Sequence, residues 1–296
     1  MAGQRLDLFV GEKLKLPRAR LKELFEADGV RVDGRKAKKG QKVEAGQTVT
    51  VTLEAQAPRA AAPTPLAPLR VLHEDPALVF VDKASGAPSH PLQPGEEGTV
   101  ANALVARYPE CGTASLDPRE GGLCHRLDIE TSGVLLAARS REAWEAMRNA
   151  FSRQEVEKRY WALVTGPIAD EGEIDLPLRH HPRHPDRVQP AADGGDDARQ
   201  ARSTFRVLGR AGVASLVEVQ IHTGVLHQVR AHLAAIGAPL VGDGLYGGEA
   251  DPALGRFFLH ARTLAVRHPT SSERIVVESP LPAELTRALE VRGLST

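Results

Sequence analysis

One aspartate of this 296-residue chain lies among cations in a glycine-flanked stretch. Residues 121–133 read Gly-Gly-Leu-Cys-His-Arg-Leu-Asp-Ile-Glu-Thr-Ser-Gly, and the apolar run 134–138 follows directly. An apolar run of this kind, bounded by glycine, is typical of a buried strand. The spacing therefore predicts that Asp128 is displayed in a turn at the end of a strand, beside His125 and Arg126.

Three roles for Asp128 follow from the residues alone. The carboxylate is a nucleophile or base that Arg126 keeps ionised, one half of a structural ion pair, or the cap of the following turn. An Asp beside an Arg is more often structural than catalytic. The pair by itself leaves all three roles open.

The wider pattern His-Arg-Leu-Asp-x-x-Thr-Ser-Gly resembles the signature of the RluA-type pseudouridine synthases. The resemblance implies that Asp128 is the catalytic residue and that His125, Arg126 and Thr131 contact the substrate. Arg126 would bind the RNA backbone or help to replace the flipped base. A motif is a hypothesis until its context agrees.

Two further segments resemble motifs of the same family. Residues 82–91 resemble the first motif, with Ala84 where the family has proline, and this places Lys83 near the phosphates of the substrate. Residues 158–166 match Lys-x-Tyr-x-Ala-Leu-Val. Their alternation predicts a strand with Tyr160 and Trp161 on opposite faces. The resemblance implies that Tyr160 stacks on a flipped uracil, whereas the residue type alone favours a core position.

The last motifs lie at 222–237 and 259–269. A glycine turn starts a helix that Gly237 ends, and on it His227 and Arg230 share a face. The resemblance implies that Arg230 pairs with the catalytic aspartate, that His227 contacts the substrate and that Leu259 packs under the base. The chain departs from the family at Val225 and Leu226, where Arg and Thr are usual, which removes a phosphate or nucleotide contact.

The N-terminal part carries the basic surplus of a chain that is neutral overall. Residues 1–54 contain 12 Lys and Arg against 8 Asp and Glu. A helix pair followed by strands at 30–34 and 49–53 resembles the S4 RNA-binding domain, although a charge run such as 35–42 also suits a solvated loop. The resemblance implies these RNA-binding residues: Arg18, Arg20, Lys22, Arg35, Lys36, Lys38 and Lys39.

The order of elements predicts three parts. Residues 1–54 form the S4-like domain, the Ala/Pro-rich stretch 55–68 a semi-rigid linker, and 69–296 the catalytic domain. The fold class that the resemblance implies is α+β. Its catalytic domain has a mixed, mostly antiparallel sheet with flanking helices and a central cleft, and its N-terminal domain is a small α/β module.

Local patterns add several expectations for the catalytic domain. Ser140 caps a helix whose stripe of Trp144, Met147 and Phe151 faces the core. Residues 202–208 and 214–221 form an antiparallel strand pair, and the segment from 180 to 201 is an exposed loop. On the helix after 227, Val229, Leu233 and Ile236 face the core.

Composition and residue spacing argue against a membrane protein, a secreted protein and a metal site. No apolar run reaches membrane-spanning length and the N-terminus does not open onto an apolar signal region, so we expect a cytoplasmic protein. Cys111 and Cys124 have no CxxC spacing, and the histidines of 180–184 have no partner at metal-ligand spacing. We expect no metal, no cofactor, no membrane contact and a monomer.

The sequence therefore predicts an RNA pseudouridine synthase. Large-subunit ribosomal RNA is the preferred substrate and transfer RNA the second. Breaking the C1′–N1 bond and rejoining through C5 needs a nucleophilic carboxylate and a shaped pocket rather than an oxidant. One rival is an Asp-dependent glycosidase or hydrolase, for which Glu130 is the nearest second carboxylate. The other is an RNA-binding protein on the same scaffold that has lost activity.

Overall fold

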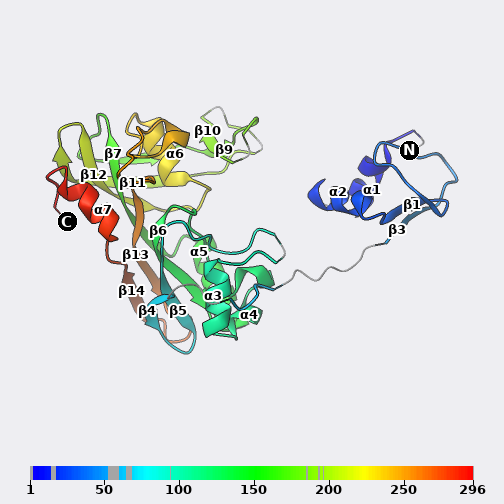
Figure 1. Ribbon diagram of the computed structural model, residues 1–296, viewed down its shortest axis with the longest axis horizontal. Helices are drawn as coiled ribbons and strands as arrows, with labels where there is room; N and C mark the ends of the chain where they lie inside the picture. The colour runs from blue at the N-terminus through cyan, green and yellow to red at the C-terminus, as the bar shows by residue number, and fades with distance from the viewer. Residues whose placement is uncertain are drawn as a thin grey trace. The chain divides into compact units, whose positions relative to one another are not determined.

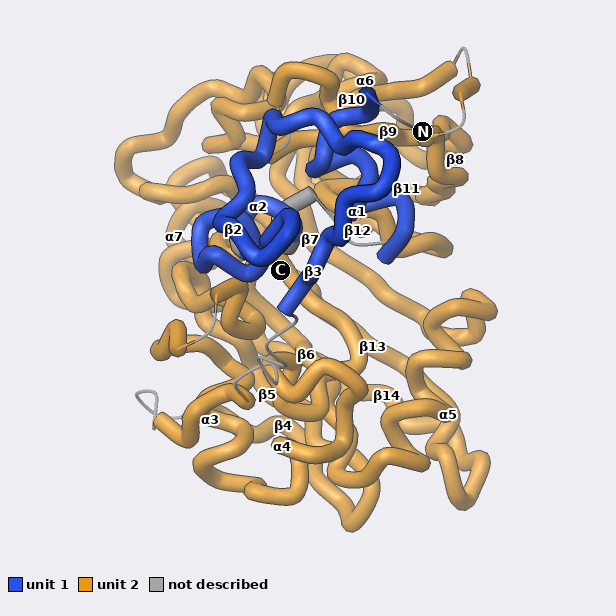
Figure 2. The backbone as a smooth tube through the Cα atoms, turned by 90° about the vertical axis from the view of Figure 1, so that its right-hand side faces the viewer, with its two compact units in different colours: residues 1–57 blue, residues 58–296 orange. Residues whose placement is uncertain are grey.

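The computed structural model describes residues 3–14, 18–52, 60–64, 69–93, 95–184, 186–192, 194–195 and 197–295. The chain divides into two compact units, residues 1–57 and 58–296 (Figure 2). Each unit has hydrophobic clusters of its own. The second unit thus begins before residue 69, where the sequence placed the end of a linker.

The N-terminal unit packs two helices on a small antiparallel sheet with strand order β2-β1-β3. The elements are α1 (Leu6–Leu14), α2 (Arg18–Glu26), β1 (Val30–Val32), β2 (Arg35–Lys36) and β3 (Val49–Val51). Leu6, Val10, Leu24 and Val30 are buried between the layers. The predicted helix pair and both strands are present, and the basic run contributes one more short strand.

A nine-stranded sheet organises the second unit, in the order β4-β5-β6-β13-β7-β12-β11-β8, with β14 beside β13. Its strands are β4 (Arg70–Glu74), β5 (Leu78–Lys83), β6 (Ser132–Ala138), β7 (Glu157–Thr165), β8 (Glu171–Asp175), β11 (Arg202–Ala211), β12 (Ala214–Ile221), β13 (Leu259–Arg267) and β14 (Arg274–Glu278). Among the described strands, β6 and β13 alone pair in parallel. The mixed, mostly antiparallel sheet is confirmed, as is the β11–β12 pair.

Helices lie at both ends of this sheet (Figure 1). They are α3 (Val100–Arg107), α4 (Cys111–Ala114), α5 (Arg141–Ser152), α6 (Gln228–Ala235) and α7 (Ala283–Glu290), with 3-10 turns at Pro118–Glu120 and Gly244–Tyr246. The first three gather beside β4, β5 and β6, whereas α6 lies near β7, β11 and β12. Helix α6 and the helices α3–α5 therefore lie beside different halves of the sheet.

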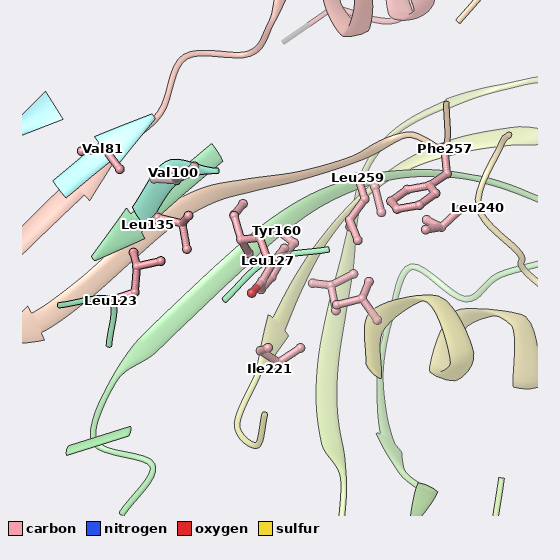
Figure 3. Packing of buried hydrophobic residues seen from close by; sticks show 14 of the residues in the cluster. Val81, Val100, Leu123, Leu127, Leu135, Tyr160, Ile221, Leu240, Phe257 and Leu259 are labelled. Atoms are coloured by element: carbon pink, nitrogen blue, oxygen red, sulfur yellow. The ribbon is translucent and has the colours of Figure 1, made fainter. Parts of the chain in front are cut away.

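Alternation along the strands divides the core between the two faces of the sheet. On β7, Tyr160 and Ala162 join the largest cluster, while Leu163 joins the cluster under α7. Figure 3 shows Leu127, Tyr160 and Leu259 within the largest cluster. The predicted opposite faces of Tyr160 and Trp161 are confirmed.

Helix α5 follows its predicted pattern with one difference. Ser140 accepts a hydrogen bond from the Ala143 N–H, so it is the N-cap. Trp144 and Met147 are buried. Phe151 is only partly buried, because it reaches the cleft described below.

Three expectations need correction. The 180–201 segment is an exposed loop only in part. It includes β10 (Val188–Pro190), which pairs with β9 (Leu178–His180), and its Val188 and Ala201 are buried in one cluster with Ala231 of α6. Ile236 is exposed beyond the end of α6 instead of in the core. In the predicted linker, Ala61 is buried in the second unit and its N–H donates to Pro118 O.

Within the described residues, none of the helices has both the length and the apolar character needed to cross a bilayer.

Candidate active site

The Asp128 turn, residues 127–131, precedes strand β6 and is shaped by close backbone contacts. Gly122 and Gly133 have positive φ values of 78° and 119°. A Cβ at Gly133 would lie 2.2 Å from Ala261 O, and one at Gly122 would lie 2.5 Å from Ala138 O. Only glycine allows both conformations and both approaches. The glycines that flank the motif thus bring the chain against its neighbours on either side of Asp128.

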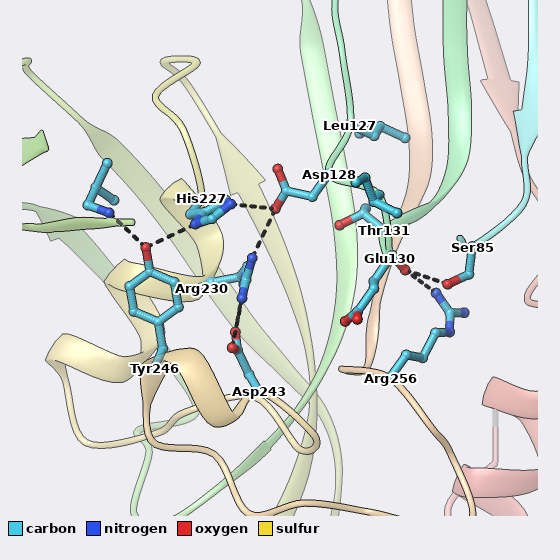
Figure 4. A network of polar contacts seen from close by, with 12 residues as sticks. Ser85, Leu127, Asp128, Glu130, Thr131, His227, Arg230, Asp243, Tyr246 and Arg256 are labelled. Carbon is cyan, nitrogen blue, oxygen red and sulfur yellow. Dashed lines mark hydrogen bonds and ion pairs between the residues drawn. The ribbon is translucent and has the colours of Figure 1, made fainter. Parts of the chain in front are cut away.

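Hydrogen bonds from three side chains, two of them buried, hold the backbone of the Asp128 turn. Lys83 donates to Ala84 O, Ile129 O and Thr131 O at 3.0, 2.7 and 2.8 Å. Ser85 and Arg256 both donate to Glu130 O, as Figure 4 shows. Direct hydrogen bonds to its backbone carbonyls therefore hold the turn in place.

The role predicted for Lys83 is wrong in this structure. Its side chain is 1% exposed, so it cannot reach the phosphates of a substrate in solution. Three carbonyls use all three N–H donors of the ammonium. Burial lowers the pKa of Lys83 to about 7. The residue positions the turn, and its donors are all used within the protein.

Asp128 faces a second wall of the site, which we call the α6 wall: His227, Arg230, Asp243 and Tyr246. Arg230 Nη1 lies 3.5 Å from Asp128 Oδ2. Its Nε and Nη2 form a bidentate pair with Asp243 at 2.7 and 2.8 Å. Since Asp243 fixes the guanidinium, one cation is presented to Asp128 in a set orientation. The expected proximity of Arg230 and Asp128 is present.

His227 bridges Asp128 and Tyr246. It is the N-terminal cap of α6 in a left-handed conformation, with φ 52°. Its Nε2 is 3.8 Å from Asp128 Oδ2, and its Nδ1 is 3.1 Å from the Tyr246 hydroxyl. Burial lowers the pKa of His227, so the ring is neutral at pH 7. Val188 N–H donates to the Tyr246 oxygen. When the Tyr246 hydroxyl donates its proton to Nδ1, the neutral ring carries its own proton on Nε2, the nitrogen that faces Asp128.

Asp128 opens onto a cleft of about 820 Å³. Tyr160, Leu259 and Leu127 line it with apolar surface, and all three are buried. Thr131 also lines the cleft, and its buried Oγ1 has no hydrogen-bond partner among the described residues. Burial and the charge of Asp128 raise the pKa of the Tyr160 phenol. A flat, uncharged ring therefore lies near the carboxylate.

The cleft is electropositive. Its cations are Arg126, Arg148, Lys158, Arg199 and Arg230, against the carboxylates of Glu120 and Asp128. Arg126 is exposed at the rim. A basic surplus inside a cleft concentrates polyanions by electrostatic attraction. The local charge differs from that of the neutral chain as a whole.

His125 has a structural role as well as a place in the cleft. Its Nε2 accepts a hydrogen bond from Leu136 N–H at 3.1 Å, and its ring stacks on Phe151 at 4.9 Å. Burial lowers the pKa of His125 to about 3. The imidazole is neutral and one nitrogen is occupied, so it supplies no positive charge to a substrate.

Val225 and Leu226 line the cleft beside His227. Both are partly buried against Leu178 and Ala231. Gln228 fixes their loop, because its Oε1 accepts from Val225 N–H and its Nε2 donates to Arg202 O. Val225 and Leu226 therefore form an ordered apolar part of the cleft lining.

The seven residues predicted to bind RNA in the N-terminal unit lie on α2, on β2 and in the loop after it. Arg35, Lys38 and Lys39 are exposed. Lys36 pairs with Asp28, and Lys22 lies 3.7 Å from Glu26. The side chains of Arg18 and Arg20 lie outside the described part of the structure.

Sequence reasoning assigned no role to Asp243, Tyr246, Phe257 or Arg256. Phe257 lies under the Arg230 guanidinium at 4.2 Å from its ring centroid. A residue thirteen positions from its partner leaves no periodic signal that local spacing rules detect. The local feature that could have marked Asp243 and Tyr246 is the glycine-bounded run Gly-Asp-x-x-Tyr-Gly at 242–247.

Comparisons with known proteins agree with this geometry. Residues 77–235 match the family model described as RNA pseudouridylate synthase. The chain is 35% identical to "Ribosomal large subunit pseudouridine synthase D" of Xanthomonas campestris pv. campestris, covering 97% of this chain and 88% of that one. It is 37% identical to an uncharacterized RNA pseudouridine synthase of Chloroflexus aurantiacus, over 95% and 88%.

A solved structure shows the same fold. Human RNA pseudouridylate synthase domain containing 4 superposes with a TM-score of 0.61 at 24% identity, covering 77% of this chain and 94% of that chain. The family match spans the Asp128 turn and α6, and the relatives extend over nearly all of the chain. The chain belongs to the RNA pseudouridylate synthase family, in its RluA-type branch.

Proposed function

We propose that this pseudouridine synthase isomerises one or more uridines of large-subunit ribosomal RNA. The relative from Xanthomonas campestris is named for the large ribosomal subunit and matches the chain over nearly its whole length. The surplus of cations in the cleft suits a polyanionic substrate. Transfer RNA is the second candidate.

The reaction moves a glycosidic bond from nitrogen to carbon. The C1′–N1 bond breaks, the uracil turns, and a C1′–C5 bond forms. The proton on C5 is lost and N1 gains one, so no electrons are exchanged with another molecule. The protein must hold the detached base, supply a carboxylate and exclude water. A target inside a helix must first be flipped out of its stack.

Asp128 is the nucleophile of this proposal. The carrying observation is its carboxylate, 3.5 Å from Arg230, at the mouth of a cleft that also contains Tyr160 and Leu259. Arg230 places an opposite charge beside the carboxylate. Attack at C1′, attack on the base and proton abstraction to give a glycal all begin from a carboxylate.

Tyr160 and Leu259 provide the contact surfaces for the uracil. Both line the cleft near Asp128, and the raised pKa of Tyr160 keeps its phenol neutral. Aromatic faces stack on bases that have been displaced from a helix. Thr131 offers a hydroxyl with a free hydrogen-bonding capacity to a polar edge of the base.

Arg126 and His227 flank the carboxylate on the solvent side and the α6 side. Arg126 is exposed, so its role is to bind the RNA backbone or to occupy the space of the flipped base. His227 presents a neutral N–H toward Asp128 and helps to orient it.

The N-terminal unit acts as an S4-like RNA-binding module in this proposal. Two helices and a basic strand and loop support it, with Arg35, Lys38 and Lys39 exposed. Changing these three residues to Glu should weaken binding of ribosomal RNA. It should also reduce the slope of log affinity against log salt concentration by the amount that about three phosphate contacts contribute. Unchanged affinity would contradict the assignment. A cytoplasmic monomer is the form in which we propose that the enzyme acts.

A pseudouridine map tests the substrate. Total RNA is compared from cells with the gene, without it, and complemented by wild type or Asp128→Asn. We expect one or more uridines of large-subunit ribosomal RNA to lose the modification on deletion and to regain it with wild type alone. A site in transfer RNA would move the assignment to that substrate. No change at any site would favour a binding protein.

A further inference from the structure

The second unit contains two lysines, Lys83 and Lys158, although arginine is common throughout it. Both are buried, with exposed fractions of 1% and 7%. An ammonium removed from water needs acceptors for each of its three donors. The two lysines differ in how far the protein meets this need.

Lys83 is fully satisfied inside the protein. Three carbonyl oxygens accept from its Nζ. Its donors are all used, and the residue is absent from the cleft lining. Lys83 thus illustrates a lysine whose function is purely structural.

Lys158 has one hydrogen-bond acceptor in the described part of the chain. Its Nζ donates to Thr223 O at 2.9 Å. The ammonium also lies 5.8 Å from the centroid of Phe151. Two of its donors therefore lack acceptors among the described residues, yet the side chain lines the cleft. A buried cation with spare donors on a cleft wall is equipped to bind an anion.

The position of Lys158 relates it to the target base. It lies on β7 two residues before Tyr160, on the same face of the strand. Side chains two residues apart on a strand are separated by about 7 Å. A nucleotide whose base contacts Tyr160 can place its phosphate at this distance. Thr223 belongs to the loop that leads to His227, so the same ammonium contacts the loop of the α6 wall.

The surroundings of Lys158 favour a phosphate of the RNA backbone, rather than a carboxylate of the protein, as the partner of its ammonium. Arg148 lines the same cleft, and it too donates to a carbonyl, that of Cys124. Within the described part of the chain, no carboxylate contributes to the pKa of Lys158, and Glu120 interacts with Arg148 instead. Burial lowers the pKa of Lys158 to about 8, which leaves it mostly charged at pH 7.

We propose that Lys158 binds a phosphate of the substrate RNA, next to the nucleotide whose base is held at Tyr160. The proposal rests on the proposed RNA substrate and deepens it. Lys158 is a binding and positioning residue, whereas Asp128 carries the chemistry. Its contact with Thr223 O would couple the arrival of the phosphate to the loop that carries His227.

The test uses the full-length protein and an unmodified transcript of large-subunit ribosomal RNA from the same organism. Dissociation constants are measured between about 50 and 200 mM salt, where each phosphate contact adds about 0.7 to 0.9 to the logarithmic slope. Three variants are compared: Lys158→Met, Lys158→Gln and Lys158→Arg. Arg267→Met, an exposed site without a role here, is the control for lost charge.

We expect Met and Gln to lower the slope by about one contact and to weaken binding roughly tenfold. Arg should retain most of the slope, and Arg267→Met all of it. Gln is decisive, because it can still donate to Thr223 O but carries no charge. If Gln binds with the slope and affinity of wild type, the proposal is wrong and Lys158 only anchors the loop.

Activity on the same transcript separates this proposal from the previous one. We expect Lys158→Gln to raise KM by about the same tenfold with a smaller change in kcat. If wild type binds the transcript but forms no pseudouridine in it, the ribosomal substrate is wrong. The salt slopes on that transcript still decide whether Lys158 contacts phosphate.

Discussion

The two walls that meet at Asp128 are built by different means. The Asp128 turn is held through its backbone: Lys83, Ser85 and Arg256 donate to carbonyls of residues 129–131. The α6 wall is held through side chains, by the Arg230–Asp243 pair and the His227–Tyr246 contact. One wall fixes where the carboxylate is, and the other sets the charge around it.

This difference separates positioning from electrostatics within one site. Backbone carbonyls cannot be changed by substitution, so the Asp128 turn depends on a few buried donors. Side chains on the α6 wall can be changed singly without removing a support of the turn. Substitutions on the first wall should therefore displace the carboxylate as they reduce stability, whereas those on the second should act mainly on the charge and protons around a carboxylate that stays in place.

Among the substitutions that compare the two walls, Lys83→Met is expected to have the largest effect. Three carbonyls would lose their donor, and leaving buried acceptors unpaired costs about 1–3 kcal/mol each, partly offset by removal of a buried charge. We expect the free energy of unfolding to fall by about 3 kcal/mol and activity to fall with it. Denaturant unfolding measures this change. Lys13→Met, at an exposed lysine, is the control and should change stability by less than about 0.5 kcal/mol.

A stable but inactive Lys83→Met protein would contradict the positional role, because the lysine would then act on the substrate itself.

Arg230→Gln is expected to have the next largest effect. It removes the cation 3.5 Å from Asp128 and frees Asp243, leaving two carboxylates near one another. We expect kcat to fall about 10²–10³-fold, in the range found when one charge-stabilising group is removed. Single-turnover kinetics measure the change.

Arg230→Lys tests geometry against charge. Lysine keeps the charge but cannot form the bidentate pair with Asp243. We expect it to recover only part of the activity. Full recovery would mean that Asp243 does not orient the cation, and the α6 wall would lose its central contact.

Tyr246→Phe should have the smallest effect. It removes the hydroxyl between Val188 N–H and His227 Nδ1 but keeps the ring beside Arg230. We expect a loss of about 1 kcal/mol in stability and a fall in kcat of less than about tenfold. A loss as large as that of Arg230→Gln would show that the proton on His227 takes part in the reaction.

The sequence predicted well those features of the fold that have a signal in neighbouring residues. The apolar run 134–138, the alternation around Tyr160 and the cap at Ser140 all depend on neighbours in the chain. The β9–β10 hairpin was missed because polar and charged residues outnumber its buried Leu178 and Val188. Its apolar contacts come from α6, far along the chain.

Prediction of the site was likewise limited to residues that have a signal in the local sequence. Asp128 and Arg230 were found through motifs, and the structure brings them together. Lys83 was assigned to the substrate because residue type and motif do not report burial. Whether a lysine meets three carbonyls or one depends on long-range contacts, such as those of Lys83 with Ile129 and Lys158 with Thr223. Spacing in the sequence does not encode them.

Asp128→Asn tests the central claim most directly. The substitution keeps the size of the side chain and the backbone bonds of the turn but removes the nucleophilic carboxylate. A ribosomal RNA transcript labelled with tritium at C5 of uridine reports the reaction, because the C5 proton is lost when the new bond forms. We predict label release by wild type, release at least about 10⁴-fold slower by Asp128→Asn, and RNA affinity within about threefold of wild type. Release by Asp128→Asn within tenfold of the wild-type rate would show that another group performs the chemistry.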